Sequence, residues 1–426
     1  MSDPTLLILG ATGDLTLRLL LPGIGSLLSR EPGRRLRVIG VGRRDRPRSE
    51  FAGLVADALA SGGAGAEAID RIRDQADHHR IDMSDPGELA RLLDRYADAE
   101  RLVLYFALPP EVTRRVCAAL RHVGLGERTH LALEKPFGSD LRSSRDMEEL
   151  VLGLAPPERI HRIDHFLGMS SVQRLAGCDA ASDRPEEIEI CFEESLALEG
   201  RAGYYDGAGA LVDMIQSHLL LVLAELLRPA AAPGSGSAVH EERVRILRAL
   251  RPWGGDPASA SRRGRYTAGS IGGRRIPAYT DETGVDAARG TETLAQITVE
   301  VDLPAWAGVP ITLRSGKALG APAQHVALRM PDAEPVLLPL VDGAAEGTHV
   351  GAYGAVVGAV LDGRDALGVG SDAVEECWRI IDEVRATWSA GGVEMDEYSA
   401  GSGVPETWRP RARGGTRTPT PEGTGT

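Results

Sequence analysis

The chain has 426 residues, of which 42% are hydrophobic and 26% are charged, a composition typical of a globular protein with one large or two ordinary domains. Its net charge of −13 excludes a general nucleic-acid or anionic-membrane binder, but it allows a local basic pocket for a phosphorylated ligand. The four cysteines lack the spacing of a metal finger or a redox pair, so we expect small buried thiols and no metal site.

The first residues form a short apolar segment that lacks the composition of a signal peptide. No uninterrupted apolar run reaches the roughly 18 residues that a membrane span requires. We therefore expect a cytoplasmic protein without a membrane partner.

Strand-like and helix-like segments alternate over residues 1–165. A helix is predicted over residues 15–28, directly after the first strand. The predicted strands cover residues 6–9, 36–41, 102–107, 130–134 and 160–163. Because strands and helices alternate, we expect a parallel sheet covered by helices on both faces.

The pattern changes near residue 186. A long helix is predicted over residues 206–227, followed by a Pro/Ala/Gly/Ser loop over 229–238. The other predicted elements are strands at 187–192, 293–303, 309–314 and within 325–340, and helices at 241–250, 352–362 and 372–388. The predicted fold class is therefore α/β followed by α+β. We expect an N-terminal Rossmann dinucleotide-binding domain over residues 1–168, a larger α+β domain with a mostly antiparallel sheet over 169–408, and a disordered tail over 409–426.

A glycine-rich turn follows the first predicted strand. Backbone N–H groups at such a strand-to-helix turn, together with the helix dipole, bind a pyrophosphate, and glycine lets the backbone approach it. The spacing is GxxG rather than GxGxxG, so a tight turn without a ligand is the alternative. The predicted cofactor-binding residues of the loop are Gly10, Thr12, Gly13, Asp14 and Leu15.

Two arginines follow the second predicted strand. An NAD site usually carries an acidic residue here, whereas arginine accommodates the 2′-phosphate of NADP. Arg43 and Arg44 therefore favour NADP, although Asp45 follows them at once and a solvated surface pair is the alternative.

Seven segments carry motifs that occur in one order in a known family. They are residues 10–15, 107–110, 134–138, 162–168, 200–218, 314–319 and 394–402. On these motifs the chain resembles the glucose-6-phosphate dehydrogenase family nearly end to end. The resemblance implies a Rossmann domain, a large α+β domain that also dimerises, and a sugar or sugar-phosphate substrate. We accordingly expect a homodimer or a dimer of dimers.

The resemblance also implies roles for individual residues. His218 corresponds to the family's general base, Asp164 to the carboxylate that orients it, and Lys135 to the lysine between substrate and cofactor. Histidine with an orienting carboxylate suits proton abstraction near neutral pH. The sugar would be held by His165, Glu194, Asp213 and Lys317, and the nicotinamide bordered by Pro109 and Pro136. From the residues alone, His218 also fits a core histidine, and α-helical spacing would place it about 140° from Asp213.

The chain departs from the family where the 6-phosphate is bound. The family has tyrosine at Phe166 and lysine at Met169, so only His165 remains of three phosphate-binding groups. Two further differences are Glu193 where lysine is common and Ser217 where asparagine is usual.

Two interpretations of these differences compete. Either the substrate lacks the 6-phosphate, or a nearby arginine such as Arg162 or Arg174 replaces the lysine. Two alternatives of other classes are a non-catalytic, cofactor-binding relative and a different dinucleotide-dependent oxidoreductase.

Overall fold

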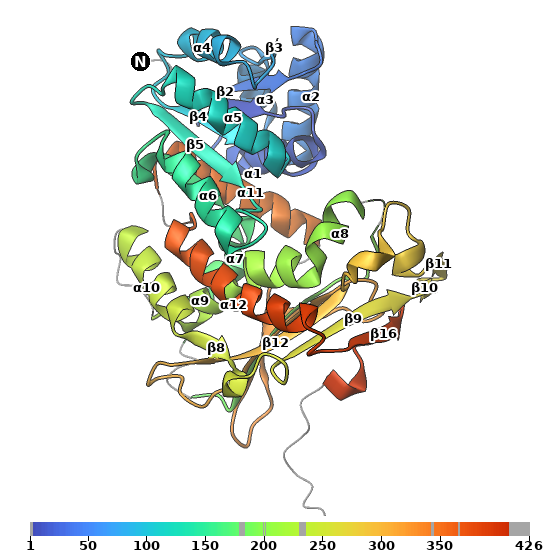
Figure 1. The fold of residues 1–426 in the computed structure, drawn as a ribbon. Helices are drawn as coiled ribbons and strands as arrows, with labels where there is room; N and C mark the ends of the chain where they lie inside the picture. The colour runs from blue at the N-terminus through green and yellow to red at the C-terminus, as the bar shows by residue number, and fades with distance from the viewer. Residues whose placement is uncertain are drawn as a thin grey trace, which may run out of the picture.

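The computed structural model describes residues 3–178, 184–198, 200, 202–229, 236–341, 345–364 and 367–408, with only the backbone of 345–348. The predicted tail over 409–426 lies outside the described residues. The chain forms two large sheets, one in each half, with most helices packed on them (Figure 1).

The first sheet has six parallel strands in the order β3-β2-β1-β4-β5-β6, which confirms the predicted Rossmann arrangement. Strand β3 was not predicted, because its sequence Asp-His-His-Arg has no apolar run. The strands are β1 (Thr5–Leu9), β2 (Arg37–Gly42), β3 (Asp77–Arg80), β4 (Leu102–Phe106), β5 (Thr129–Glu134) and β6 (Ile160–Ile163).

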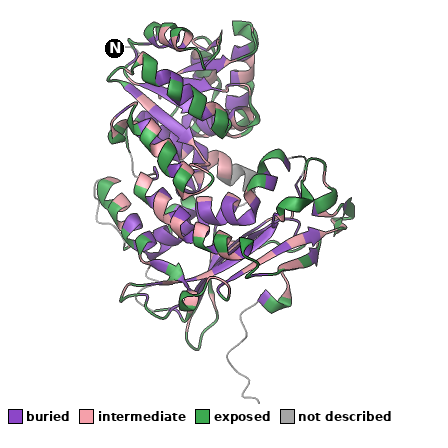
Figure 2. Ribbon diagram, viewed as in Figure 1, coloured by how far each residue is buried: buried purple, intermediate pink, exposed green. Residues whose placement is uncertain are grey.

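Helices cover both faces of this sheet, and its strands are buried between them (Figure 2). One face packs on α1 (Leu21–Arg30), α2 (Arg48–Ser61) and α3 (Ala66–Arg73), and α1 is preceded by a π-helical turn at Thr16–Leu20. The other face packs on α4 (Pro86–Arg95), α5 (Pro110–Val123) and α6 (Leu141–Leu152).

The second sheet has the order β15-β14-β7-β13-β12-β9-β16, and β8 also pairs with β12. Only the β7–β13 and β9–β16 pairs are parallel, so the mostly antiparallel character is confirmed. A separate hairpin joins β10 (Gly269–Ile271) and β11 (Arg274–Ile276). The strands of the large sheet are β7 (Glu187–Glu193), β8 (Leu250–Pro252), β9 (Ser261–Thr267), β12 (Leu294–Val301), β13 (Ile311–Gly316), β14 (Gln324–Arg329), β15 (Val336–Pro339) and β16 (Met395–Ser399).

The helix predicted over residues 206–227 is three consecutive pieces rather than one. The first, α8 (Ala202–Ala210), has a kink at Gly209, whose φ is 67°. A π-helix follows at Leu211–Leu219, and α9 (Leu220–Leu227) completes the run. The run is long and apolar enough to cross a membrane, which a search for uninterrupted apolar stretches misses. However, 89% of its most apolar stretch is buried inside the protein, as in the core helix of a soluble domain.

The helices α9, α10 (Gly236–Arg248) and α12 (Ser371–Ser389) form one hydrophobic core with the second sheet. Helix α11 (Ala345–Leu361) instead packs on α1, so it completes the cover of the first sheet. The two helices approach so closely at Gly23 that a Cβ there would lie 2.6 Å from the Cβ of Tyr353. The domain boundary at residue 168 remains a prediction, and the first core includes residues from far beyond it.

Candidate active site

The predicted phosphate loop lies between β1 and the π-helical turn that leads into α1. Gly10 has φ of 89°, and a Cβ there would lie 2.2 Å from the carbonyl oxygen of Ala107, so only glycine fits. Thr16 Oγ1 donates to the carbonyl oxygen of Gly10 at 3.2 Å and holds the turn. Thr12 is half-buried, and Gly13 and Asp14 are exposed. The loop therefore presents backbone to an open groove.

That groove continues along the ends of the parallel strands, where open α/β sheets bind ligands. Arg43 and Arg44 follow β2 directly, are exposed and line it. Pro109, at the end of β4, lines the other side. Arg80 and Arg115 line the same groove and were not predicted, because Arg80 depends on the unrecognised β3. The groove fits a dinucleotide with a phosphorylated ribose.

Lys135 and Pro136 follow β5, and a cis peptide bond joins them. Lys135 Nζ donates to the backbone carbonyl of Asp213 at 3.0 Å and lies 3.6 Å from its carboxylate. The lysine therefore connects the first domain to the π-helix that carries Asp213 and His218.

The predicted base and its carboxylate are in direct contact. His218 Nδ1 lies 2.5 Å from Asp164 Oδ1, which also accepts a hydrogen bond from the backbone N–H of Phe166 at 3.0 Å. Both side chains are buried, and the ring of Phe166 stacks on His218 at 4.1 Å. Because Nδ1 is engaged by Asp164, Nε2 of His218 is the nitrogen left to accept a proton.

The π-helix explains how Asp213 and His218 serve one site. In a π-helix each N–H bonds to the carbonyl five residues earlier, so residues five apart lie about one turn apart on the same side of the helix. The separation of 140° expected for an α-helix therefore does not apply. Ser217 instead turns back and donates to the carbonyl of Val212 at 2.9 Å.

Burial dominates the electrostatics of this pair. It raises the pKa of Asp164 to about 6, and it lowers the pKa of His218 well below its usual value. At neutral pH the carboxyl group is therefore ionised and the imidazole is neutral. This is the protonation state that proton abstraction requires.

Lys317 and Glu194 follow the neighbouring strands β13 and β7, and their charged groups lie 2.5 Å apart. Lys317 Nζ also lies 5.2 Å from the centre of the Tyr205 ring. The Tyr205 hydroxyl is buried without a hydrogen-bond partner, which makes it a further candidate for binding a sugar hydroxyl. Tyr205 was not singled out from the sequence because tyrosine is common in cores.

Several departures from the family have structural explanations. Glu193 does not enter this site, because it forms a buried ion pair with Arg314, 2.7 Å away. Met169 is fully buried in the hydrophobic core of the second domain. Arg162 is held by Glu148 through hydrogen bonds of 2.5–3.0 Å, and Arg174 is exposed beyond α7 (Ser170–Gln173).

His165 lies beside the base, with its ring centre 5.0 Å from that of His218. On its other side it stacks on Tyr353 of α11 at 5.0 Å, and His349 of the same helix lies 5.1 Å away. Asp164, His165 and His218 place potential ligand atoms within 4.8 Å of one another. Two of these atoms already form the His218–Asp164 hydrogen bond. The expectation that no metal binds stays a prediction.

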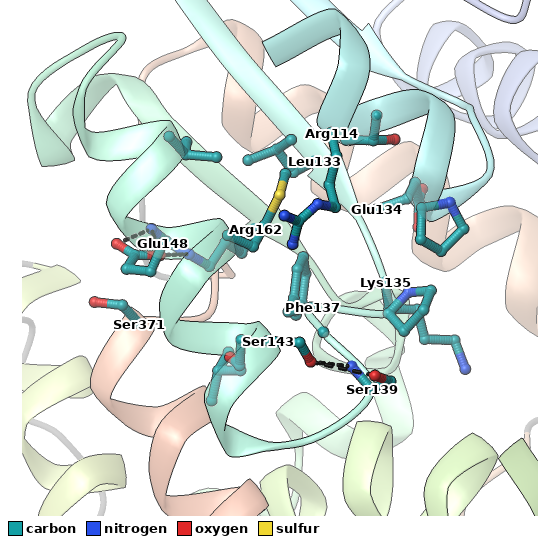
Figure 3. A pocket seen from close by; sticks show the side chains of 18 of the residues that line it. Arg114, Leu133, Glu134, Lys135, Phe137, Ser139, Ser143, Glu148, Arg162 and Ser371 are labelled. Carbon is teal, nitrogen blue, oxygen red and sulfur yellow. Dashed lines mark hydrogen bonds and ion pairs between the residues drawn. The ribbon is translucent and has the colours of Figure 1, made fainter. Parts of the chain in front are cut away.

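A separate cavity of about 160 Å³ lies between α5, α6 and α12, behind the loop that carries Lys135 (Figure 3). Arg162 and its partner Glu148 line it, whereas Lys135 points away from it (Figure 3). Arg162 is therefore directed away from the candidate sugar site.

Comparisons with known proteins identify the family. The domain described as "Glucose-6-phosphate dehydrogenase, NAD binding domain" matches residues 7–174, and "Glucose-6-phosphate dehydrogenase, C-terminal domain" matches residues 182–338. The chain is 29% identical to glucose-6-phosphate 1-dehydrogenase of Zymomonas mobilis, with 95% of this chain and 96% of that protein covered.

Two solved structures share the fold. The crystal structure of glucose-6-phosphate 1-dehydrogenase from Mycobacterium avium is 27% identical, with a TM-score of 0.79 and 96% of each chain covered. A glucose-6-phosphate dehydrogenase in complex with its substrate is 22% identical, with a TM-score of 0.81 and coverage of 95% of this chain and 96% of that one. The chain therefore belongs to the glucose-6-phosphate dehydrogenase family and is an oxidoreductase that uses NADP.

Proposed function

We propose that the protein oxidises a hexopyranose, glucose 6-phosphate or a related hexose, at C1 to the lactone, with His218 as the general base. The contact between His218 Nδ1 and Asp164 carries this proposal, because it leaves Nε2 free to take the proton of the C1 hydroxyl. NADP supplies the hydride acceptor for the oxidation.

Each protein group then has one task. Asp164 fixes the orientation of the imidazole and stabilises the imidazolium that forms when the proton arrives. Lys135 holds the polar edge of the site through Asp213, between the cofactor groove and the sugar. The pair Glu194–Lys317 and the backbone-anchored Asp213 offer hydrogen-bond partners for the ring hydroxyls.

The cofactor would be held by the first domain. Its pyrophosphate fits the loop at Gly10–Leu15, and its 2′-phosphate fits the exposed guanidinium groups of Arg43 and Arg44. Pro109 and Pro136 would border the nicotinamide.

The decisive experiment measures NADPH absorbance with glucose 6-phosphate, glucose and other hexoses. A hexose that carries deuterium at C1 should react more slowly than the unlabelled sugar, and the product should be the 1,5-lactone. Oxidation at another carbon, or no oxidation of any hexose, would show that the proposal is wrong.

We also propose a homodimer or a dimer of dimers in the cytoplasm. Figure 1 shows the long helices α9, α10 and α12 on one face of the second sheet, and Val336 and Leu337 of its edge strand are exposed. The cysteines Cys117, Cys191 and Cys377 are free and buried, as is usual in a reducing compartment. Light scattering of the purified protein measures the oligomeric state.

A further inference from the structure

Strand β3 lies at the edge of the first sheet and ends beside the arginines that follow β2 (Figure 1). The two strands are parallel, and their register places Arg80 directly opposite Gly42. Both residues line the cofactor groove together with Arg43 and Arg44. The end of β3 therefore borders the same part of the groove as the two predicted cofactor-binding arginines.

His78 precedes Arg80 by two residues on β3, so both side chains lie on the same face of the sheet. Among the described residues, its ring alone lies within 4 Å of the position that a Cβ on Gly42 would occupy, with Nε2 at 3.4 Å. Because residue 42 is glycine, the space beside the imidazole stays open.

The imidazole of His78 lacks a hydrogen-bond partner. The residue is only 8% exposed, and both of its ring nitrogens are buried without a partner. The same is true of Nε of Arg46, which lies between β2 and α2 and acts electrostatically on His78. Unpartnered buried polar atoms are costly unless a ligand supplies the missing hydrogen bonds.

Free guanidinium groups gather at this point of the groove. Arg43, Arg44 and Arg80 are exposed, and none of them forms an ion pair within the part of the chain that the structure describes. The carboxylate of Asp82, which also lines the groove, accepts hydrogen bonds from the backbone N–H of Ser84 at 2.9 Å and from its hydroxyl at 2.5 Å. The three guanidinium groups are thus available to an anionic ligand.

We infer that β3 supplies a second wall of the site for the cofactor's 2′-phosphate, in which Arg80 pairs with the phosphate and His78 donates a hydrogen bond to it. This inference rests on the proposed cofactor groove and extends it beyond Arg43 and Arg44. A guanidinium forms paired, charge-assisted hydrogen bonds to a phosphate, and an imidazole N–H adds a further donor. NAD lacks this phosphate and gains nothing from β3.

The test measures binding rather than turnover. Fluorescence titration gives Kd for NADPH and for NADH with the intact wild type, Arg80→Met and His78→Leu. We expect Arg80→Met to raise Kd for NADPH by about ten- to a hundredfold, as for the loss of a charged hydrogen bond. For His78→Leu we expect a rise of about three- to tenfold, as for a neutral one. Kd for NADH should stay at the wild-type value in both variants.

Arg73→Met is the matched control for Arg80→Met. Arg73 ends α3, pairs with Asp70 at 2.8 Å and leads into the start of β3, away from the groove. This variant should bind both dinucleotides as the wild type does.

The outcomes separate this inference from the proposed groove. If the two variants weaken NADH as much as NADPH, or leave Kd for NADPH unchanged, their side chains do not contact the 2′-phosphate and the inference is wrong, while the groove stands. A selective loss in Arg80→Met alone would overturn the role of His78. If the wild type binds neither dinucleotide, the proposed groove is wrong and the inference fails with it.

Discussion

The two halves of the candidate active site consist of different kinds of chemical groups. The cofactor groove consists of backbone around Gly10 and of exposed guanidinium groups such as Arg43. The sugar site consists of buried side chains that are charged or polar and already paired, such as His218 with Asp164. Exposed groups stay solvated in the folded protein, whereas buried charges depend on their partners. Changes in the sugar half should therefore be much more damaging than changes in the cofactor half.

The largest effect is expected at the base. His218→Ala should lower kcat by about 10²–10⁴-fold, the usual contribution of general acid–base catalysis, without changing the affinity for NADP. Stopped-flow kinetics and fluorescence titration of NADPH measure the two quantities. The variant His122→Ala, on the exposed end of α5, serves as the control. If His218→Ala kept the wild-type kcat, His218 would not be the general base.

Substitution of Arg314 tests how strongly the stability of the sheet that carries the sugar site depends on buried ion pairs. Arg314→Met should lower the free energy of unfolding by about 3–5 kcal/mol, because it leaves Glu189 and Glu193 buried without their partner. Urea denaturation measures the change.

The control for this prediction is an exposed pair on the same sheet. Arg329 meets Glu187 at 3.1 Å but is 46% exposed, so Arg329→Met should cost only about 0–1 kcal/mol. Equal losses in the two variants would contradict the distinction between the buried and the exposed pair.

The cofactor half should respond more weakly. Arg43→Ala and Arg44→Ala should each raise KM for NADP by about ten- to a hundredfold, as expected for the loss of a charged hydrogen bond, and leave KM for NAD unchanged. Arg35→Ala, just before β2, is the matched control because Arg35 pairs with Asp3 and, among the described residues, does not line the groove. An equal rise in KM for NAD would show that the two arginines do not bind the 2′-phosphate.

The smallest effect concerns pH. Burial raises the pKa of Asp164 to about 6, so kcat should be halved near pH 6 and fall about tenfold per unit below it, as the carboxylate takes up a proton. Above this range the profile should be flat, because the lowered pKa of His218 keeps the ring neutral. In Asp164→Asn this acidic limb should disappear. A wild-type rate that stays constant down to pH 5 would contradict the assignment.

The same contrast explains what the sequence could predict. The cofactor groove follows from local patterns, since a strand, a glycine turn and arginines at a strand end are contiguous in the chain. The fold classes of both domains also follow from periodicity, whereas the order of the strands in each sheet comes from the structure. Strand β3 was missed because its residues are polar, and Arg80 was missed with it.

The sugar site depends on contacts between distant segments. The pairing of Arg314 with Glu193 joins two strands, and His349 reaches the site from a helix that packs on the other domain. The π-helix that aligns Asp213 with His218 has no sequence signal among its leucines. These features require the tertiary structure.

The return of α11 to α1 has a consequence for synthesis of the protein. Gly354 lies against Gly23, so close that a Cβ on Gly354 would lie 2.5 Å from the Gly23 carbonyl oxygen. A ribosome adds roughly 5–20 residues each second, so the partner of α1 emerges on the order of 20–60 seconds after it. During that interval the nascent first domain exposes the apolar face of α1. The growing chain is therefore most exposed to chaperones and proteases before its last third has been translated.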